Sequence, residues 1–414
     1  MPTIRAMGER AQAARTQLAK LDGVAKRTAL EAIAGGLEVG CAEIIAANAL
    51  DLQAGRESSM SAALLDRLSL DEGRIVGMAK GVRDISAEED PVGRVLWGTV
   101  RPNGLRIEKI TVPLGVVGVI FEARPNVCSD AAALCLMAGN ACILRGGKEA
   151  IHSNTAIAEV MRQALERSGL PADCIQLVED TSRESAAEMM GLTGLIDVLI
   201  PRGGAGLIRA VVENARVPVI ETGAGNCHIY VDKSADIGMA AEIIHNAKTS
   251  RPSVCNAAES LLVHRSVAVE ALPVIAERLA VKKVELRGDA AACAILPGTV
   301  PAAENDWGTE YGAYVMSVKV VDSLDEAIAH IAQYSTHHSE AIITQNYAAA
   351  ERFLREVDSA AVYVNASTRF TDGGEFGFGA EIGISTQKLH ARGPLGLANL
   401  VSEKYLIRGS GQIR

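Results

Sequence analysis

The sequence predicts an α/β protein with a doubly wound, Rossmann-type domain, a second α/β domain and a β-hairpin arm. From residue 115 onward, short β-branched runs alternate with helical stretches, and a second such series begins after residue 232. Residues 96–112 alternate apolar and polar residues around Pro-Asn-Gly, which is a strong hairpin signal. The chain has 414 residues, 48% of them hydrophobic, so it can bury a large aliphatic core in two or three domains.

Helices are expected throughout residues 1–92, because apolar residues recur there at intervals of three and four, as in 32–52. The hairpin at 96–112 follows, and it has too little apolar surface to be stable alone. We expect the hairpin and the charged tail, 398–414, to pair between subunits, since such strands tend to find a sheet edge. The chain should therefore form a homo-oligomer, with dimer and tetramer both left open.

The first parallel series has expected strands at 115–122, 141–145, 174–180, 196–203 and 217–222, with helices between them. We expect the first α/β domain, with the N-terminal helices, to span residues 1–232 and the second α/β domain to span 233–356. Residues 357–397 are expected to return to the first domain, before the oligomerisation strand at 398–414.

The formal charge of −9 is spread along the chain, which argues against nucleic acid or an anionic membrane as the main partner and favours a small molecule. The N-terminus has no apolar signal region, and the longest apolar run is too short and too interrupted to span a bilayer. Eight scattered cysteines form no CxxC pair and should be reduced thiols. We therefore expect a soluble, cytoplasmic protein.

Two loops that follow expected strands could bind a nucleotide. The loop at 144–150 is not a Walker A motif, because Cys142 stands where that motif needs glycine. The loop at 201–209 opens a helix whose N–H groups could meet a pyrophosphate, although it lacks G-x-G-x-x-G spacing. Arg145 and Lys148 would supply the positive charge that an adenosine 2′-phosphate needs. A plain strand-to-helix turn and a solvated basic pair remain the alternatives.

Cys255 is the one cysteine that lies among small and polar residues, in Ser250–Ser260, with Arg251 four residues before it. A nucleophilic thiol needs exposure and a lowered pKa, and a loop with a nearby cation offers both. No Cys–His motif lies near it, and the eight histidines form neither HExxH nor a compact ligand cluster. A papain-like protease and metal catalysis are therefore disfavoured.

Six motifs occur in an order that resembles the aldehyde dehydrogenase superfamily: FEARPN, LRGGKEA, PRGGAG, VIETGAGN, SRPSVCN and VYVN. Glu221 precedes Cys255 by 34 residues, similar to the spacing in that superfamily. The stretches 250–256, 321–342 and 385–397 are long and specific, and they resemble the gamma-glutamyl phosphate reductase family within it. The resemblance covers nearly the whole chain and implies an aldehyde dehydrogenase-like fold.

The resemblance implies NADPH-dependent reduction of L-glutamyl 5-phosphate to L-glutamate 5-semialdehyde and phosphate, the second step of proline biosynthesis from glutamate. A thiolate at Cys255 would form a thioester that accepts hydride from NADPH. The resemblance also implies glutamate 5-kinase, which makes the acyl phosphate, as a partner. The first alternative is a hydrolytic aldehyde dehydrogenase with Glu221 as the base that activates water. The second is a catalytically inactive scaffold.

The resemblance also assigns residues to roles. For catalysis we expect Cys255 and Asn126, whose amide would stabilise the oxyanion together with the Cys255 backbone N–H, unless Asn126 only caps a helix. The expected cofactor-binding residues are Arg145, Gly146, Gly147, Lys148, Arg202, Gly203, Gly204, Glu221 and Glu310. The expected substrate-binding residues are Arg124, Arg251, Arg369 and Glu381. Of these, Arg369 should hold the α-carboxylate and Glu381 the α-ammonium group, unless both pair only with protein groups or solvent.

Overall fold

The computed structural model describes residues 2–122 and 124–414 and divides into two compact units. Unit 1 comprises Met1–Thr222, Gly377–Gly383 and Leu395–Arg414. Unit 2 comprises Gly223–Phe376 and Ile384–Pro394.

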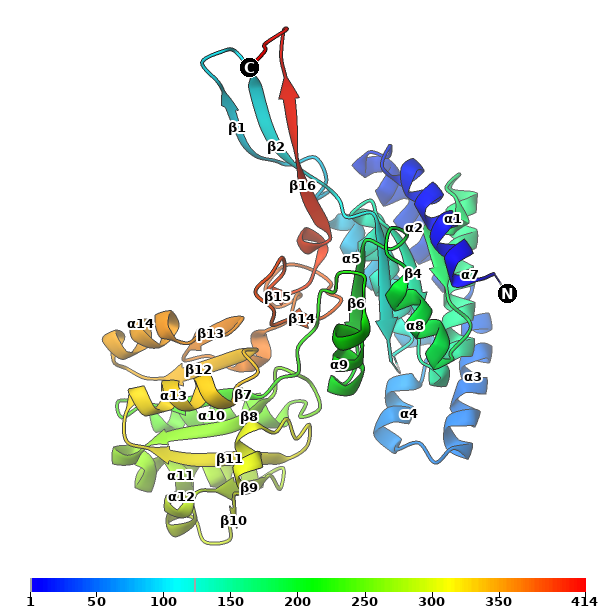
Figure 1. The fold of residues 1–414 in the computed structure, drawn as a ribbon. Coiled ribbons are helices and arrows are strands. Elements are labelled where there is room, and N and C mark those ends of the chain that lie inside the picture. Colours follow the sequence, from blue (N-terminus) through cyan, green and yellow to red (C-terminus); the bar gives the residue numbers. More distant parts are fainter. Residues whose placement is uncertain (1, 123) are drawn as a thin grey trace. The chain divides into compact units, whose positions relative to one another are not determined.

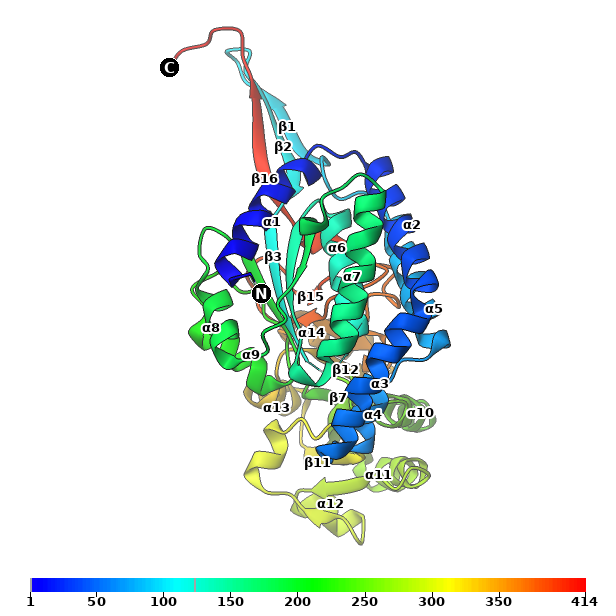
Figure 2. The same cartoon turned by 90° about the vertical axis from the view of Figure 1, so that its right-hand side faces the viewer.

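Unit 1 is built on a four-stranded parallel sheet of order β5-β4-β3-β6. Its strands are β3 (Val116–Phe121), β4 (Ala141–Arg145), β5 (Ile175–Leu177) and β6 (Val198–Arg202). Every residue of β3 is buried, as the continuous apolar run in a two-sided parallel sheet requires. Figure 2 shows helices on both sides of this sheet, with α2, α5, α6 and α7 on one side and α1, α8 and α9 on the other.

The helices of unit 1 are α1 (Ile4–Leu18), α2 (Gly23–Val39), α3 (Cys41–Glu57), α4 (Ala62–Leu68), α5 (Glu72–Ala87), α6 (Asn126–Met137), α7 (Ile151–Arg167), α8 (Arg183–Gly191) and α9 (Ala205–Asn214). The first five confirm the helical region predicted for residues 1–92. Four of them begin after an N-cap side chain that accepts a hydrogen bond from the backbone N–H three residues later; these caps are Thr3, Asp22, Ser61 and Asp71.

A three-stranded antiparallel arm projects from the rest of unit 1 (Figure 1). Its strands are β1 (Val95–Val100), β2 (Arg106–Pro113) and β16 (Val401–Arg408), in the order β1-β2-β16. The predicted hairpin is therefore present. The tail does pair with the hairpin, but within the same chain, because β16 lies beside β2 from Val401–Pro113 to Arg408–Arg106. This corrects the expectation that these two segments pair between subunits.

Unit 2 is built on a seven-stranded parallel sheet of order β10-β9-β11-β8-β7-β12-β13. Its strands are β7 (Cys227–Val231), β8 (Ala258–His264), β9 (Glu285–Gly288), β10 (Val300–Pro301), β11 (Val315–Val321), β12 (Ser339–Ile343) and β13 (Ala361–Val364). Its helices are α10 (Ile237–Thr249), α11 (Arg265–Ala280), α12 (Ala290–Ile295), α13 (Leu324–Tyr334) and α14 (Tyr347–Glu356). A small antiparallel pair, β14 (Ile384–Ser385) and β15 (Gly393–Pro394), completes the unit.

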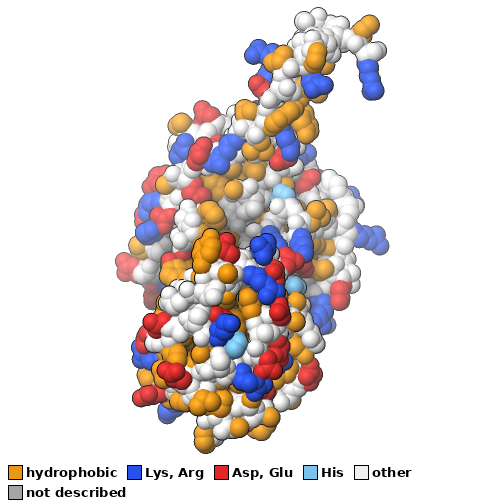
Figure 3. All heavy atoms as spheres, turned by 90° about the vertical axis from the view of Figure 1, so that its left-hand side faces the viewer, with side chains coloured by type: hydrophobic (Ala, Val, Ile, Leu, Met, Phe, Trp, Pro, Cys, Tyr) orange, Lys and Arg blue, Asp and Glu red, His pale blue; other side chains and the backbone are white. Residues whose placement is uncertain are grey.

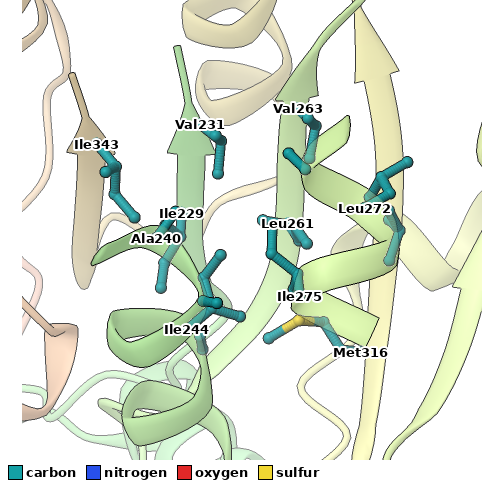
Figure 4. Close-up of a cluster of buried hydrophobic side chains, with 14 of the residues drawn as sticks. Ile229, Val231, Ala240, Ile244, Leu261, Val263, Leu272, Ile275, Met316 and Ile343 are labelled. Carbon is teal, nitrogen blue, oxygen red and sulfur yellow. The ribbon is translucent and has the colours of Figure 1, made fainter. Parts of the chain in front are cut away.

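Aliphatic side chains from β7, β8, β11 and β12 form the core of unit 2 against α10 and α11. In Figure 4, Ile229, Leu261 and Met316 lie on adjacent strands and point toward Ile244 and Ile275 of these two helices. All five are buried to within one per cent of full burial. The core consists of interlocking aliphatic chains, which explains how a chain with only 3% aromatic residues can fold.

The expected domain boundaries need correction in two places. Residues 223–232 belong to unit 2, because they supply β7, which pairs with β8 and β12 inside the second sheet. Of residues 357–397, only 377–383 and 395–397 belong to unit 1, because β13 and the β14–β15 pair belong to unit 2. The strand predicted at 217–222 forms only an isolated bridge between Val219 and Leu199. No helix among the described residues has the length and apolarity needed to cross a membrane.

Candidate active site

Cys255 lies in the turn that joins α10 to β8. The helix ends at Thr249, and the chain makes consecutive turns from Pro252 before β8 begins at Ala258. Cys255 is half-buried, whereas Cys128, Cys135, Cys142, Cys174 and Cys227 are buried. The turn lies at the amino-terminal edge of the sheet of unit 2. This edge differs from the carboxyl-terminal edge at which open parallel sheets usually bind ligands.

The segment that leads into β7 fixes the backbone of Cys255. The Cys227 thiol donates a hydrogen bond to the Cys255 carbonyl oxygen, with an S···O distance of 3.2 Å. A Cβ atom at position 225 would lie 1.5 Å from the same carbonyl oxygen, so only glycine allows this approach. Gly225 therefore has a packing role beside the nucleophile, which explains a glycine of the VIETGAGN motif.

Arg369 contacts the turn on both sides of Cys255. Its Nε donates to the Ser250 side-chain oxygen at 3.0 Å, and its Nη1 donates to Asn256 Oδ1. Asn256 is buried, and its Nδ2 donates to the Arg369 carbonyl oxygen at 3.2 Å. Thr368, the residue before Arg369, donates its hydroxyl to the Asn256 carbonyl oxygen at 2.7 Å. The structure thus places Arg369 against the turn that carries Cys255, through Ser250 and Asn256.

A buried ion pair links the two elements on either side of the loop that carries Cys255. Lys248, next to the end of α10, donates from Nζ to Glu259 Oε2 of β8 at 2.5 Å, and both side chains are fully buried. Glu259 Oε1 accepts a hydrogen bond from the Gly312 N–H at 3.1 Å. Burial raises the pKa of Glu259 and lowers the pKa of Lys248, because both charged forms lose their hydration. Glu310, which is exposed, belongs to the same loop as Gly312.

The loop after β4 carries the residues predicted to bind the adenosine end of a cofactor. Lys148 is exposed, whereas Arg145 is half-buried and donates from Nη2 to the carbonyl oxygens of Thr181 at 2.7 Å and Ser182 at 2.9 Å. A Cβ atom at Gly146 would lie 2.2 Å from the side-chain nitrogen of Asn154, so a larger residue there would have to displace the buried Asn154 side chain. Arg145 is therefore partly engaged in holding the loop after β5, which the sequence did not indicate.

The loop after β6 opens α9 as predicted, but a carboxylate already meets its backbone. The Gly204 N–H donates to Glu122 Oε2 at 2.9 Å, and Glu122 follows the end of β3. Arg202 is the last residue of β6, and a Cβ atom at Gly203 would lie 2.5 Å from the same Glu122 oxygen. The amino end of α9 therefore binds an internal anion, as helix amino ends do.

Asn126 is the first residue of α6 and is exposed. Its side chain does not cap the helix; instead, Nδ2 donates to Asp130 Oδ2 at 2.9 Å, one turn further along. The alternative of a helix cap is therefore wrong. Burial raises the pKa of Asp130 to about 6, although the hydrogen bond from Asn126 opposes this rise. The Asn126 amide remains at the carboxyl end of β3, two residues after the half-buried Arg124 begins the turn.

The remaining predicted residues divide between the units. Glu221 lies at the end of the first segment of unit 1, and Glu381 lies in its Gly377–Gly383 segment. Arg251, Cys255, Glu310 and Arg369 belong to unit 2. Among residues 2–122 and 124–414, no cluster of three or more His, Cys, Asp or Glu side chains could hold a metal ion.

Sequence reasoning missed Glu122, Asn256, Lys248 and Glu259. Glu122 and Asn256 act through partners far away in the chain, Gly204 and Arg369, whereas Lys248 and Glu259 pair with each other across the Cys255 loop. The only available signal was a charged or amide residue inside an otherwise apolar stretch, as Glu259 is in Ala258–His264.

Comparison with known proteins agrees with this geometry. The model of the aldehyde dehydrogenase family matches residues 3–295. A gamma-glutamyl phosphate reductase of Halothermothrix orenii is 58% identical over 398 residues, 95% of either chain. Another, of Clostridium perfringens, is 61% identical over 374 residues, 90% of either chain.

Solved structures agree as well. The crystal structure of gamma-glutamyl phosphate reductase from Thermotoga maritima is 47% identical, covers 100% of both chains and has a TM-score of 0.98. An acetylating aldehyde dehydrogenase from Geobacillus thermoglucosidasius is 18% identical with a TM-score of 0.71, over 99% of this chain and 97% of that one, and shares the fold. The chain belongs to the aldehyde dehydrogenase family and, within it, to the gamma-glutamyl phosphate reductases.

Proposed function

We propose that this chain reduces L-glutamyl 5-phosphate to L-glutamate 5-semialdehyde, with NADPH as the hydride donor and Cys255 as the nucleophile. The observation that carries the proposal is the half-buried thiol of Cys255, held in a fixed turn beside an arginine. Gamma-glutamyl phosphate reductase relatives at 58% identity over 95% of the chain support the substrate. The reaction is the second step of proline biosynthesis from glutamate and would take place in the cytoplasm.

In the proposed reaction, the Cys255 thiolate attacks the acyl carbon, a C–S bond forms, and the bond from carbon to the phosphate oxygen breaks. The backbone N–H of Cys255 and the amide of Asn126 are the proposed donors to the oxyanion. When bound, NADPH supplies the hydride that reduces the thioester carbon. Collapse of the thiohemiacetal then regenerates the Cys255 thiolate and releases the aldehyde.

The residues of unit 1 suit a phosphorylated dinucleotide. The N–H groups of Gly203 and Gly204 at the start of α9 are anion donors, and one of them already binds a carboxylate. Lys148 offers an exposed cation beyond β4 for an adenosine 2′-phosphate. We propose Arg145, Gly146, Gly147, Arg202, Glu221 and Glu310 as the other residues that surround the cofactor.

Three further residues are proposed to bind substrate. Arg124 and Arg251 would attract its negative charges, and Glu381 would pair with the α-ammonium group, since a buried charge without a partner is costly. The acyl phosphate is labile in water, so direct transfer from glutamate 5-kinase is part of the proposal.

An assay of the reverse reaction tests the function. Purified protein is given glutamate 5-semialdehyde and NADP, with and without inorganic phosphate, and NADPH formation is followed. The proposal expects NADPH to form only with phosphate present. Oxidation that proceeds equally without phosphate would favour a hydrolytic enzyme with Glu221 as base. No oxidation, together with an unreactive Cys255, would favour a scaffold.

A further inference from the structure

Arg369 is held in place before any ligand arrives. Two of its guanidinium nitrogens donate to Ser250 and Asn256, which flank Cys255 in the sequence. Its backbone is fixed as well, because Asn256 Nδ2 donates to the carbonyl oxygens of Arg369 at 3.2 Å and Thr371 at 2.9 Å. Because both the side chain and the backbone of Arg369 are held by hydrogen bonds, the guanidinium group loses little conformational entropy when it binds an anion. The arginine is therefore preorganised for an anionic ligand.

Arg251 and Cys255 are close enough to Arg369 for their charges to affect its pKa. Burial lowers the pKa of Arg369, the charge of Arg251 lowers it further, and the negative charges of Asp372 and Cys255 oppose this. Ser250, which contacts Arg369, is the chain neighbour of Arg251, and Arg251 is exposed. Within the described parts of the chain, no carboxylate forms an ion pair with either arginine. Two like charges gathered beside a thiol favour an anionic ligand.

We infer that Arg251 and Arg369 bind the phosphoryl group of the acyl phosphate and hold it as it leaves. The inference rests on the proposed function and replaces the assignment of Arg369 to the α-carboxylate. The reason is position: Arg369 is held by Asn256, the residue directly after Cys255, so its guanidinium lies near the carbon that Cys255 attacks. The phosphoryl group is attached at that carbon, whereas the α-carboxylate lies at the opposite end of the substrate.

The chemistry of the leaving group fits an arginine pair. When the thiolate forms its C–S bond, the bond from carbon to the phosphate oxygen breaks and its electron pair leaves with the phosphate. Guanidinium groups bind phosphate oxygens through paired N–H donors and stabilise the charge that develops there. In the reverse direction, the same pair would position inorganic phosphate to attack the thioester.

The reverse reaction separates the two anions, because phosphate and glutamate 5-semialdehyde are then different substrates. We compare Arg251→Gln and Arg369→Lys with Arg355→Gln, a control on α14 whose side chain is 74% exposed. The inference expects KM for phosphate to rise about tenfold or more in both test variants, with KM for the semialdehyde within about twofold of wild type. The control should leave both constants unchanged.

A rise in KM for the semialdehyde, with KM for phosphate unchanged, would overturn the inference and return the arginines to the α-carboxylate. A wild-type reaction that ignores phosphate would instead overturn the proposed function itself. Alkylation of Cys255 by iodoacetamide gives a readout without turnover: inorganic phosphate should protect wild type and fail to protect Arg251→Gln. Because Arg251 is exposed, this variant should fold even where Arg369→Lys does not. Equal protection in wild type and Arg251→Gln would overturn the role of Arg251.

Discussion

At the scale of single residues, the environment of Cys255 separates it from the other thiols. Substituting Cys255→Ala should lower turnover by about 10⁴-fold or more, because no other thiol can form the thioester, while NADPH binding and the melting temperature stay near wild type. Cys293→Ala is the matched control: it also removes a half-buried thiol of unit 2, one whose Sγ donates to the Gly288 carbonyl oxygen at 3.4 Å. Steady-state rates and cofactor titration check both variants. Substantial activity in Cys255→Ala would disprove the mechanism.

The buried pair of Lys248 and Glu259 gives a stability prediction. Lys248→Met leaves the carboxylate of Glu259 buried without its cation, so the free energy of unfolding should fall by about 3 to 5 kcal/mol. The double variant Lys248→Met with Glu259→Gln removes both charges and keeps an oxygen that can accept from Gly312. It should recover most of the loss. Urea denaturation measures both, and a double variant no more stable than the single one would contradict this account.

At the scale of elements, the end of β4 and the loop after it give a prediction about which nicotinamide cofactor binds. Lys148→Ala should weaken NADPH binding by about tenfold while changing NADH binding little, because the exposed ammonium is free to meet a 2′-phosphate. Arg145→Ala should weaken both cofactors, since Arg145 also holds the carbonyl groups of Thr181 and Ser182. Fluorescence titration with both nucleotides distinguishes the two residues. Equal weakening by Lys148→Ala would mean that this lysine is only a surface charge.

The start of α9 gives a prediction of opposite sign. Glu122 places a carboxylate on the Gly204 N–H, where the pyrophosphate of the cofactor is proposed to bind. Glu122→Gln removes that negative charge, so NADPH should bind roughly two- to fivefold more tightly at low salt. The gain should shrink as salt is added. Weaker binding in the variant would show that Glu122 is a ligand of the cofactor and not its competitor.

The elements also show what local sequence can and cannot predict. Periodicity identified the helices of residues 1–92 and the strands of the parallel sheet of unit 1, because burial of one face or of a whole strand leaves a local pattern. The strand predicted at 217–222 was wrong, because an apolar run does not specify which strand it pairs with. In the structure this run forms only an isolated bridge. The contact of Asn256 with Arg369 spans 113 residues, so no local pattern could reveal it.

At the scale of the whole molecule, the arm is the part of unit 1 that can pair with a second chain. β1, β2 and β16 form a complete three-stranded sheet whose two outer edges stay unpaired within the described chain. Trp97 is 51% exposed and Ile407 is 61% exposed, and Figure 3 shows apolar side chains along the arm. Exposed apolar groups on a sheet with free edges favour association with a second copy.

We therefore expect the arm to hold subunits together. Trp97→Glu combined with Ile407→Lys should convert the oligomer to monomers, because charge on these faces disfavours their burial, while the melting profile of the monomer shows that each subunit stays folded. Val24→Lys is the control: it places a charge on α2 at a side chain that is 69% exposed in the same unit. Multi-angle light scattering measures the mass of each variant, together with a chain truncated after Gly396, which lacks β16. If the arm variant and the truncated chain both kept the mass of the wild-type oligomer, another surface would have to join the subunits.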